Sequence, residues 1–135
     1  MKKLKAGYLI AAVVLMGSCS KTLLQPNTVQ GTYNGQFELV STKSPANSTS
    51  ASVTVNFTGT QYKSTANSNY IPAGGAGKYS ISKDSVTFQD DAMHTANFDW
   101  NLLLNGSYTY TSKGDSLILS KKLGGQIYMY KLKKG

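Results

Sequence analysis

Apolar and polar side chains alternate through most of the chain after residue 30. The first alternating segment begins at Gly31, and one of its faces consists of Tyr33, Gly35, Phe37 and Leu39. Because successive side chains of a strand point to opposite faces, a period of two predicts strands with one buried face. No segment beyond residue 30 has a convincing helical period, so the pattern predicts an all-β domain.

The alternation recurs at short intervals along the rest of the chain. Further strands are predicted around residues 53–57, 79–81, 86–88, 108–110, 117–119 and 126–133, with weaker ones at 61–64 and 98–104. Turn residues at 82–84, 113–115 and 123–125 join neighbouring strands into hairpins. Residues 90–104 are the least regular: Asp90 is a candidate cap for a short helix, and Asn105-Gly106 is either a hairpin turn or a bulge.

About eight strands linked by hairpins leave two sheet edges that must be protected. Closure into an antiparallel up-and-down barrel removes both edges, and short successive hairpins favour this simple strand order. The predicted fold is therefore such a barrel, with a β-sandwich as the alternative.

Two longer loops interrupt the strands. Residues 41–52 are rich in Ser, Thr and Asn and are interpreted as a surface loop. Residues 67–77 contain several glycines, which permit a tight turn before the strand of Tyr79. They do not form a phosphate-binding loop, because a strand follows them and Tyr79 stands where Ser or Thr is required.

The N-terminus has the pattern of an export signal. Lys2, Lys3 and Lys5 precede the apolar residues 6–16, which are too few for a membrane span of about 20 residues. The segment ending at Cys19 resembles the lipobox of Gram-negative bacterial lipoproteins, with Leu15 one place early and Ser18 in place of Gly or Ala. The resemblance implies lipidation at Cys19 and cleavage before it. The alternative is an ordinary secretory signal.

This resemblance divides the chain into a signal peptide (1–18), a lipidated cysteine with its tether (19–30) and a β domain (31–135). It implies a protein held by its lipid at the outer membrane. No acidic run follows Cys19, which favours the periplasmic face over the cell surface. Cys19 is the sole cysteine, so the chain has no partner for a disulfide, and lipidation would consume the thiol.

Charge argues against nucleic acid as a partner. The formal net charge is +8, but the basic residues are lysines scattered along the chain, and arginine is absent. Arginine is the residue best suited to bidentate contacts with bases and phosphates. Scattered lysines are typical of solvated strand edges.

The candidates for catalysis or metal binding are few. His94 is the sole histidine and lies close to Asp90 and Asp91, but adjacent aspartates point in different directions on a regular backbone. No Gly-x-Ser-x-Gly motif is present, and Cys19 is assigned to the lipid. We therefore predict no metal, no cofactor and no enzymatic activity.

The opening of the first strand provides a second resemblance. Gly31-Thr32-Tyr33 is similar to the Gly-x-Trp motif of the lipocalins, with Tyr33 in place of Trp. The resemblance implies an eight-stranded barrel whose mouth holds a small apolar ligand, with residues 41–52 as a lid. It also implies that Lys131 or Lys133 takes the place of the family's Arg across the Tyr33 ring.

The aromatic residues are the candidates for lining such a cavity. The predicted ligand-binding residues are Tyr33, Phe37, Val55, Trp100 and Tyr108. The competing interpretation is a filled core, which we favour for Trp100, Phe88 and Leu102.

The last predicted strand has apolar residues on both faces. Tyr128 and Tyr130 share one face and Ile127 and Met129 the other, which predicts an exposed aromatic patch. The predicted function is a non-enzymatic, lipid-anchored envelope protein that binds a small apolar ligand. The alternative is a protein-interaction, inhibitor or structural module with a solid barrel.

Overall fold

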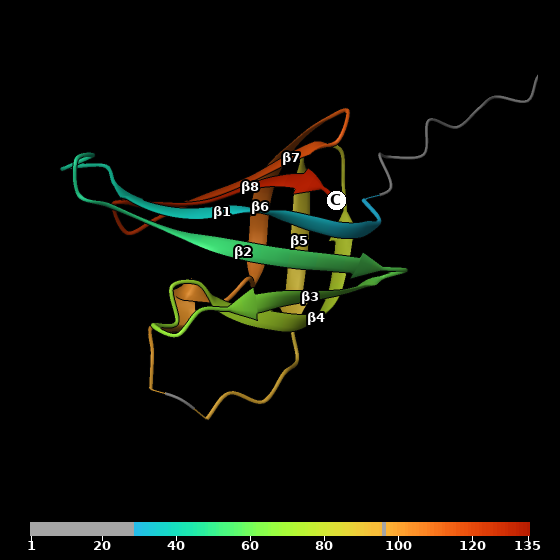
Figure 1. Ribbon diagram of the computed structural model, residues 1–135, viewed down its shortest axis with the longest axis horizontal. Helices are drawn as coiled ribbons and strands as arrows, with labels where there is room; N and C mark the ends of the chain where they lie inside the picture. Colours follow the sequence, from blue (N-terminus) through green and yellow to red (C-terminus); the bar gives the residue numbers. More distant parts are fainter. Residues whose placement is uncertain (1–28, 96) are drawn as a thin grey trace, which may run out of the picture.

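The structure, a computed structural model that describes residues 29–95 and 97–135, is a closed eight-stranded antiparallel barrel (Figure 1). Each strand pairs with the next, and the last pairs with the first. The strands are β1 (Gly31–Ser41), β2 (Ser48–Thr58), β3 (Gln61–Ala66), β4 (Ala73–Ile81), β5 (Ser85–Asp90), β6 (Gly106–Lys113), β7 (Ser116–Leu123) and β8 (Gln126–Lys134). This confirms the up-and-down barrel over the sandwich. The predicted signal peptide, Cys19 and residues 19–28 of the tether lie outside the described residues.

The alternating pattern determines which side chains face the interior. Tyr33 and Phe37 of β1 are buried, while the polar residues between them face solvent or lie partly exposed. The pairing register places Tyr33 opposite Val55 and Phe37 opposite Tyr130, so apolar residues of neighbouring strands form continuous inward rows. Burial of these rows is the main source of stability that the sequence supplies.

Two glycines allow the barrel to close. A Cβ at Gly35 would overlap the carbonyl oxygen of Lys131 on β8, and one at Gly77 would overlap that of Gln89 on β5. Glycine within a strand commonly marks such a close approach of another backbone. The β1–β8 seam that closes the barrel therefore depends on the missing side chain at position 35.

Several predicted elements differ from the structure. Strand β2 begins inside the predicted loop 41–52, and β4 begins inside the predicted loop 67–77. The strand predicted at 98–104 is wrong: it contains the 3-10 helix η1 (Trp100–Leu102), whose cap is Asp99 rather than Asp90. Asn105-Gly106 is not a two-residue hairpin, because β5 and β6 are joined by residues 91–105. Among the described residues, no helix is long and apolar enough to cross a membrane.

The barrel has two ends, which we call the floor and the mouth. The floor is the end where β1 begins and where the turns after β2, β4 and β6 lie. The mouth carries the loops after β1, β3 and β5 and the turn after β7. At the floor, Val29 is only 2% exposed, so the barrel domain includes at least two residues before the predicted boundary at Gly31.

Candidate binding surface at the mouth of the barrel

The interior of the barrel is filled by aromatic rings. Four of the predicted ligand-binding residues, Tyr33, Phe37, Val55 and Tyr108, all point inward and are buried. Ring centroids follow one another across the core, at 4.9 Å for Phe37–Tyr130, 5.9 Å for Tyr130–Tyr108, 5.7 Å for Tyr108–Phe88 and 4.8 Å for Phe88–Tyr62. These separations are those of aromatic pairs in contact. The structure thus brings the four residues together as parts of one packed core.

Two tyrosine hydroxyls in this core are buried without a hydrogen-bond partner in the part of the chain that the structure describes. They belong to Tyr108 and Tyr130, whereas the hydroxyl of Tyr62 donates to the carbonyl oxygen of Leu104 at 2.5 Å. Burial, and to a lesser degree the neighbouring tyrosines, raise the pKa of Tyr130 well above its usual value. Burial likewise raises the pKa of Tyr108. Both hydroxyls are therefore neutral donors and acceptors at physiological pH.

Residues 102–104, which we call the leucine plug, close the mouth. All three leucines of this segment are buried. The amide of Leu104 donates to the carbonyl oxygen of Gly74 at 2.8 Å, and Leu103 forms an isolated bridge with Gly74. Gly75 has φ +139°, and a Cβ there would lie 3.2 Å from the oxygen of Leu104. Gly75 therefore makes room for the plug, and the segment lies in β4 rather than in the predicted tight turn.

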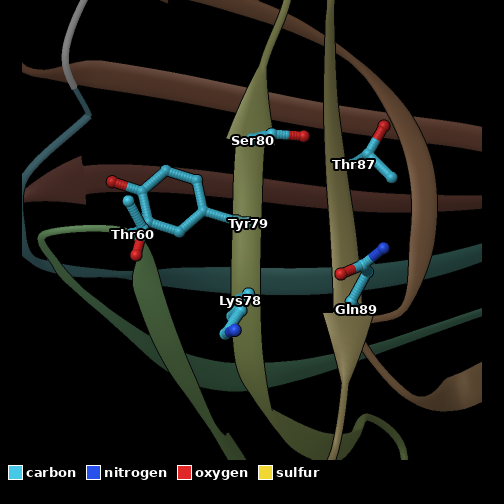
Figure 2. Close-up of a pocket in the computed structure, with 6 residues that line it drawn as sticks. All are labelled: Thr60, Lys78, Tyr79, Ser80, Thr87 and Gln89. Atoms are coloured by element: carbon cyan, nitrogen blue, oxygen red, sulfur yellow. The ribbon is translucent and has the colours of Figure 1, made fainter.

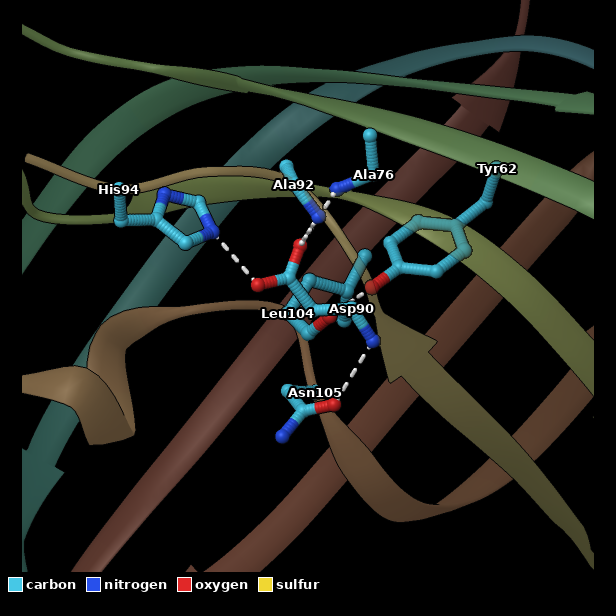
Figure 3. Close-up of polar contacts among 7 residues, drawn as sticks. All are labelled: Tyr62, Ala76, Asp90, Ala92, His94, Leu104 and Asn105. Atoms are coloured by element: carbon cyan, nitrogen blue, oxygen red, sulfur yellow. Dashed lines mark hydrogen bonds and ion pairs between the residues drawn. The ribbon is translucent and has the colours of Figure 1, made fainter.

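The carboxylate of Asp90 holds the loop that carries the plug (Figure 3). Its Oδ1 accepts hydrogen bonds from the amides of Ala76 at 2.9 Å and Ala92 at 3.4 Å, and its Oδ2 lies 2.5 Å from His94 Nε2. The amide of Asp90 donates to the Asn105 side chain at 2.9 Å. Both ends of loop 91–105 are thereby attached to the end of β5, which gives Asp90 and His94 a structural role.

Asp90, Asp91 and His94 were also the candidates for a metal site. Asp91 is exposed, while the side chains of Asp90 and His94 are nearly buried and face each other. In the described ranges 29–95 and 97–135, no group of three or more His, Cys, Asp or Glu side chains is placed to hold a metal ion.

Three aromatic side chains from two mouth loops form a column that we call the aromatic stack: Tyr70, Phe98 and Trp100. Tyr70 and Phe98 are 5.3 Å apart with ring planes inclined by 19°, and Phe98 and Trp100 are 5.6 Å apart, inclined by 28°. The ring of His94 meets both Phe98 and Trp100 edge-on. Trp100 is 61% exposed and Tyr70 40%. The core interpretation is confirmed for Phe88 and Leu102 but is wrong for Trp100, which lies outside the barrel.

The backbone at Tyr70 is unusual for a bulky residue. Its φ of +56° lies in the left-handed region, which costs a non-glycine residue about 1–2 kcal/mol. The loop is fixed by Asn67, whose Oδ1 accepts from the amides of Asn69 at 3.1 Å and Ile71 at 2.8 Å. Tyr70 and Phe98 were among the aromatic residues considered for a ligand cavity but not among the predicted ligand-binding residues. The available signal was Asn67, because asparagine side chains commonly organise such turns.

A lysine inside the mouth was also missed. Lys121 lies on the inward face of β7, with Nζ 4.8 Å from the ring centre of Tyr108 and 5.3 Å from that of Tyr128. Nζ donates to the carbonyl oxygen of Asn105 at 3.2 Å, which ties β7 to the plug loop. Partial burial lowers the pKa of Lys121, and the Asp99 carboxylate acts in the opposite direction.

Two expectations about the last strand are wrong. Lys131 does not cross the Tyr33 ring: it points outward, 3.0 Å from the Glu38 carboxylate, and Lys133 is also exposed. Tyr128 and Tyr130 face the interior, so β8 carries no exposed aromatic patch. Alternation gave two faces, but it could not tell which of two apolar faces would be inside.

An open hollow of about 220 Å³ lies on the outer wall (Figure 2). It is lined by Thr60, Lys78, Tyr79, Ser80, Thr87 and Gln89. The lining consists mainly of hydroxyl and amide groups with one ammonium, which can form hydrogen bonds with solvent or a polar ligand. This hollow is separate from the mouth, because Thr60 and Ser80 lie beside the floor turns.

Comparison with family models, with curated proteins and with solved structures found no match. The geometry of the mouth is therefore the main evidence on function. That geometry combines an exposed stack of rings, a loop anchored at both ends, and neighbouring carboxylate and amide groups. Such a surface can bind a partner with little rearrangement, because its rings are already held in place.

Proposed function

We propose that this protein is a non-enzymatic, lipid-anchored outer-membrane protein that binds a partner through the mouth surface, with a solid barrel as its scaffold. The main support is the contrast between a ring-filled interior and a tryptophan left exposed. The predicted lining residues pack against one another, the leucine plug covers them, and Trp100 faces solvent. Exposed tryptophan and tyrosine are the side chains most enriched where proteins bind partners.

The anchor at Cys19 remains part of this proposal. Val29 and Gln30 lie at the floor, so the segment that carries Cys19 joins the barrel at the end opposite the mouth. The mouth is then the end free to meet a partner. Cys19→Ala should move the protein from the membrane fraction to the soluble fraction without changing its thermal unfolding. Continued membrane fractionation of the variant would contradict the anchor.

Site-specific photo-crosslinking in intact cells tests the binding surface. The photoreactive residue is placed at Asn101, exposed beside Trp100, or at Lys83, exposed in a floor turn. We expect a discrete crosslink from position 101 that disappears in Trp100→Ala, and none from position 83. Equal crosslinking from both ends, or none from position 101, would contradict the proposal.

A small apolar ligand inside the barrel is a second candidate. The observation that favours it is the pair of core hydroxyls of Tyr108 and Tyr130, which have no hydrogen-bond partner among the described residues and would bind a polar group of such a ligand. A ligand there requires the leucine plug to move and the rings to separate. Native mass spectrometry of residues 20–135, which include every strand, after incubation with a lipid extract of the source cells tests this. A discrete added mass favours the ligand, and a bare folded protein favours the solid barrel.

A further inference from the structure

We infer that the aromatic stack binds a pyranose ring of a glycan, which lies flat against the free face of Trp100. This inference rests on the proposed function and names the class of partner. Phe98 is enclosed between Tyr70 and Trp100, so the contacts within the stack explain the positions of Tyr70 and Phe98. They leave the 61% exposure of Trp100 unexplained.

The chemistry of the indole face selects the ligand. An aromatic face carries partial negative charge, and it attracts the partially positive C–H groups on the face of a sugar ring. A flat ring ligand extends the column of near-parallel rings by one member. Stacking fixes the plane of the ligand, and hydrogen bonds at the edge of the sugar must then fix its rotation.

Groups for those hydrogen bonds flank Trp100 in the chain. Asp99 and Asn101 are both exposed, and Asp99 uses Oδ1 to accept from the Asn101 amide, at 2.9 Å. Oδ2 of Asp99 and the Asn101 side-chain amide, one residue to either side of Trp100, are therefore the nearest polar groups in the chain for such contacts. Carboxylate and amide groups together accept from and donate to vicinal hydroxyls.

The exposed area of the stack matches a small ring ligand, whereas a protein partner would have to contact further residues of the mouth. Tyr70 and Trp100 are 40% and 61% exposed, which together offers on the order of 200 Å² of aromatic surface. A stable protein interface buries about 800 Å² on each partner. The exposed carboxylates of Asp91 and Asp99 argue against an anionic lipid surface, which they would repel. A single sugar ring matches the available area.

Hydrogen bonds within the two mouth loops support the described residues that carry the stack. The left-handed backbone of Tyr70 is maintained by the three hydrogen-bonding contacts of the Asn67 side chain, and loop 91–105 is fixed through Asp90. Strained conformations of this kind persist where the surroundings over-determine them, and they cluster at ligand sites. A rigid platform loses little conformational entropy when a ligand binds.

Trp100 is the sole tryptophan, so its fluorescence reports directly on the site. The probes are cellotetraose and chitotetraose, whose equatorial substituents leave flat C–H faces, and sorbitol is the control with hydroxyls but no ring. We expect a saturable change in Trp100 emission with at least one tetrasaccharide and none with sorbitol. Calorimetry should show binding at least about tenfold weaker in Trp100→Ala. Trp100→Phe should retain part of the affinity.

Met93→Ala is the matched control, because Met93 is 90% exposed in the same loop but carries no ring. Its affinity should stay within about twofold of the wild type. The inference is overturned if neither tetrasaccharide binds at about 10 mM, or if binding survives Trp100→Ala. If the sugars fail while Trp100→Ala still removes the crosslink from position 101, the glycan is excluded and the proposed function stands. If Trp100→Ala changes neither, both are excluded.

Discussion

The two ends of the barrel are closed in different ways. At the floor, residues 29–30 lie across the opening: Gln30 Nε2 donates to the hydroxyl of Tyr79 at 2.7 Å and to the oxygen of Gly59 at 2.8 Å. The Tyr79 hydroxyl lies 2.7 Å from the oxygen of Val29. At the mouth, a leucine segment covers the core, and two tyrosine hydroxyls beneath it have no partner among the described residues.

The floor therefore contributes to stability, whereas the mouth is the end available for binding. At the floor, Gln30 also accepts from the Gly59 amide, so residues just before β1 satisfy polar groups there, and no exposed aromatic ring lies at this end among the described residues. At the mouth, the 15-residue connection 91–105 closes the barrel and carries Trp100. Long ordered loops of this kind commonly carry function. Four predictions test the comparison.

The largest effect is expected from alkaline pH. Burial raises the pKa of Tyr108 and Tyr130 above the usual value near 10. Both remain neutral in the fold above pH 10, whereas in the unfolded chain they ionise. The stabilisation is therefore complete below pH 10 and is lost as pH rises above it, by about 1.4 kcal/mol per pH unit for each tyrosine. Denaturant unfolding across this range measures the slope, and Tyr130→Phe should make it shallower. An unchanged slope would contradict this assignment.

Truncation of the leucine plug should lower the free energy of unfolding by nearly as much. Leu104 is fully buried, and Leu104→Ala should lower the free energy of unfolding by about 2–5 kcal/mol through lost burial and a cavity. Leu123→Ala is the matched control, because Leu123 is 47% exposed at the same end, and its effect should stay within about 0.5 kcal/mol. Equal effects on chemical denaturation would show that the plug does not close the core.

Removing single tyrosine hydroxyls compares the stability contributed by hydrogen bonds at the floor with that in the core. Tyr79→Phe at the floor leaves buried partners unsatisfied and should cost about 1–3 kcal/mol. Tyr130→Phe, in the core between the two ends, removes a hydroxyl without a partner in the described chain, so its effect at neutral pH should be near zero or stabilising. Paired thermal melts measure the difference. A larger loss for Tyr130→Phe would reverse the comparison.

The smallest effect on stability is expected at Trp100. Because its side chain is exposed, Trp100→Ala should change the free energy of unfolding by less than about 0.5 kcal/mol. A core tryptophan would cost about 3–5 kcal/mol instead. Urea unfolding followed by circular dichroism distinguishes the two, and a loss in the larger range would place Trp100 in the core after all.

The sequence predicts the barrel well because its walls repeat a period of two. Tyr33, Phe37 and Val55 were assigned to one inward face, and all three are buried there. The pattern fails where side chains give no alternation. Gly74 and Gly75 were predicted as a loop yet lie in β4, where Gly74 leaves room for the backbone of β3 and Gly75 for the backbone of the plug.

The mouth could not be predicted in the same way. The apolar run 98–104 resembles a strand locally, but its leucines enter the barrel end while Trp100 turns outward. This outcome depends on contacts distant in sequence, such as that between Leu104 and Gly74. Likewise, Tyr70 and Phe98 meet only because two separate loops are adjacent in the fold. The period of a sequence pattern contains no information about such contacts between distant residues.

The position of Val29 and Gln30 at the floor has a mechanical consequence. Strand β1 follows them directly and is paired along its length with β2 on one side and with β8 on the other. A pull on the preceding segment acts along β1, whereas its ladder hydrogen bonds lie perpendicular to the strand. The force is therefore shared by many bonds in shear instead of opening them one at a time. A barrel held in this way resists tension from its attachment point while its far end stays undeformed.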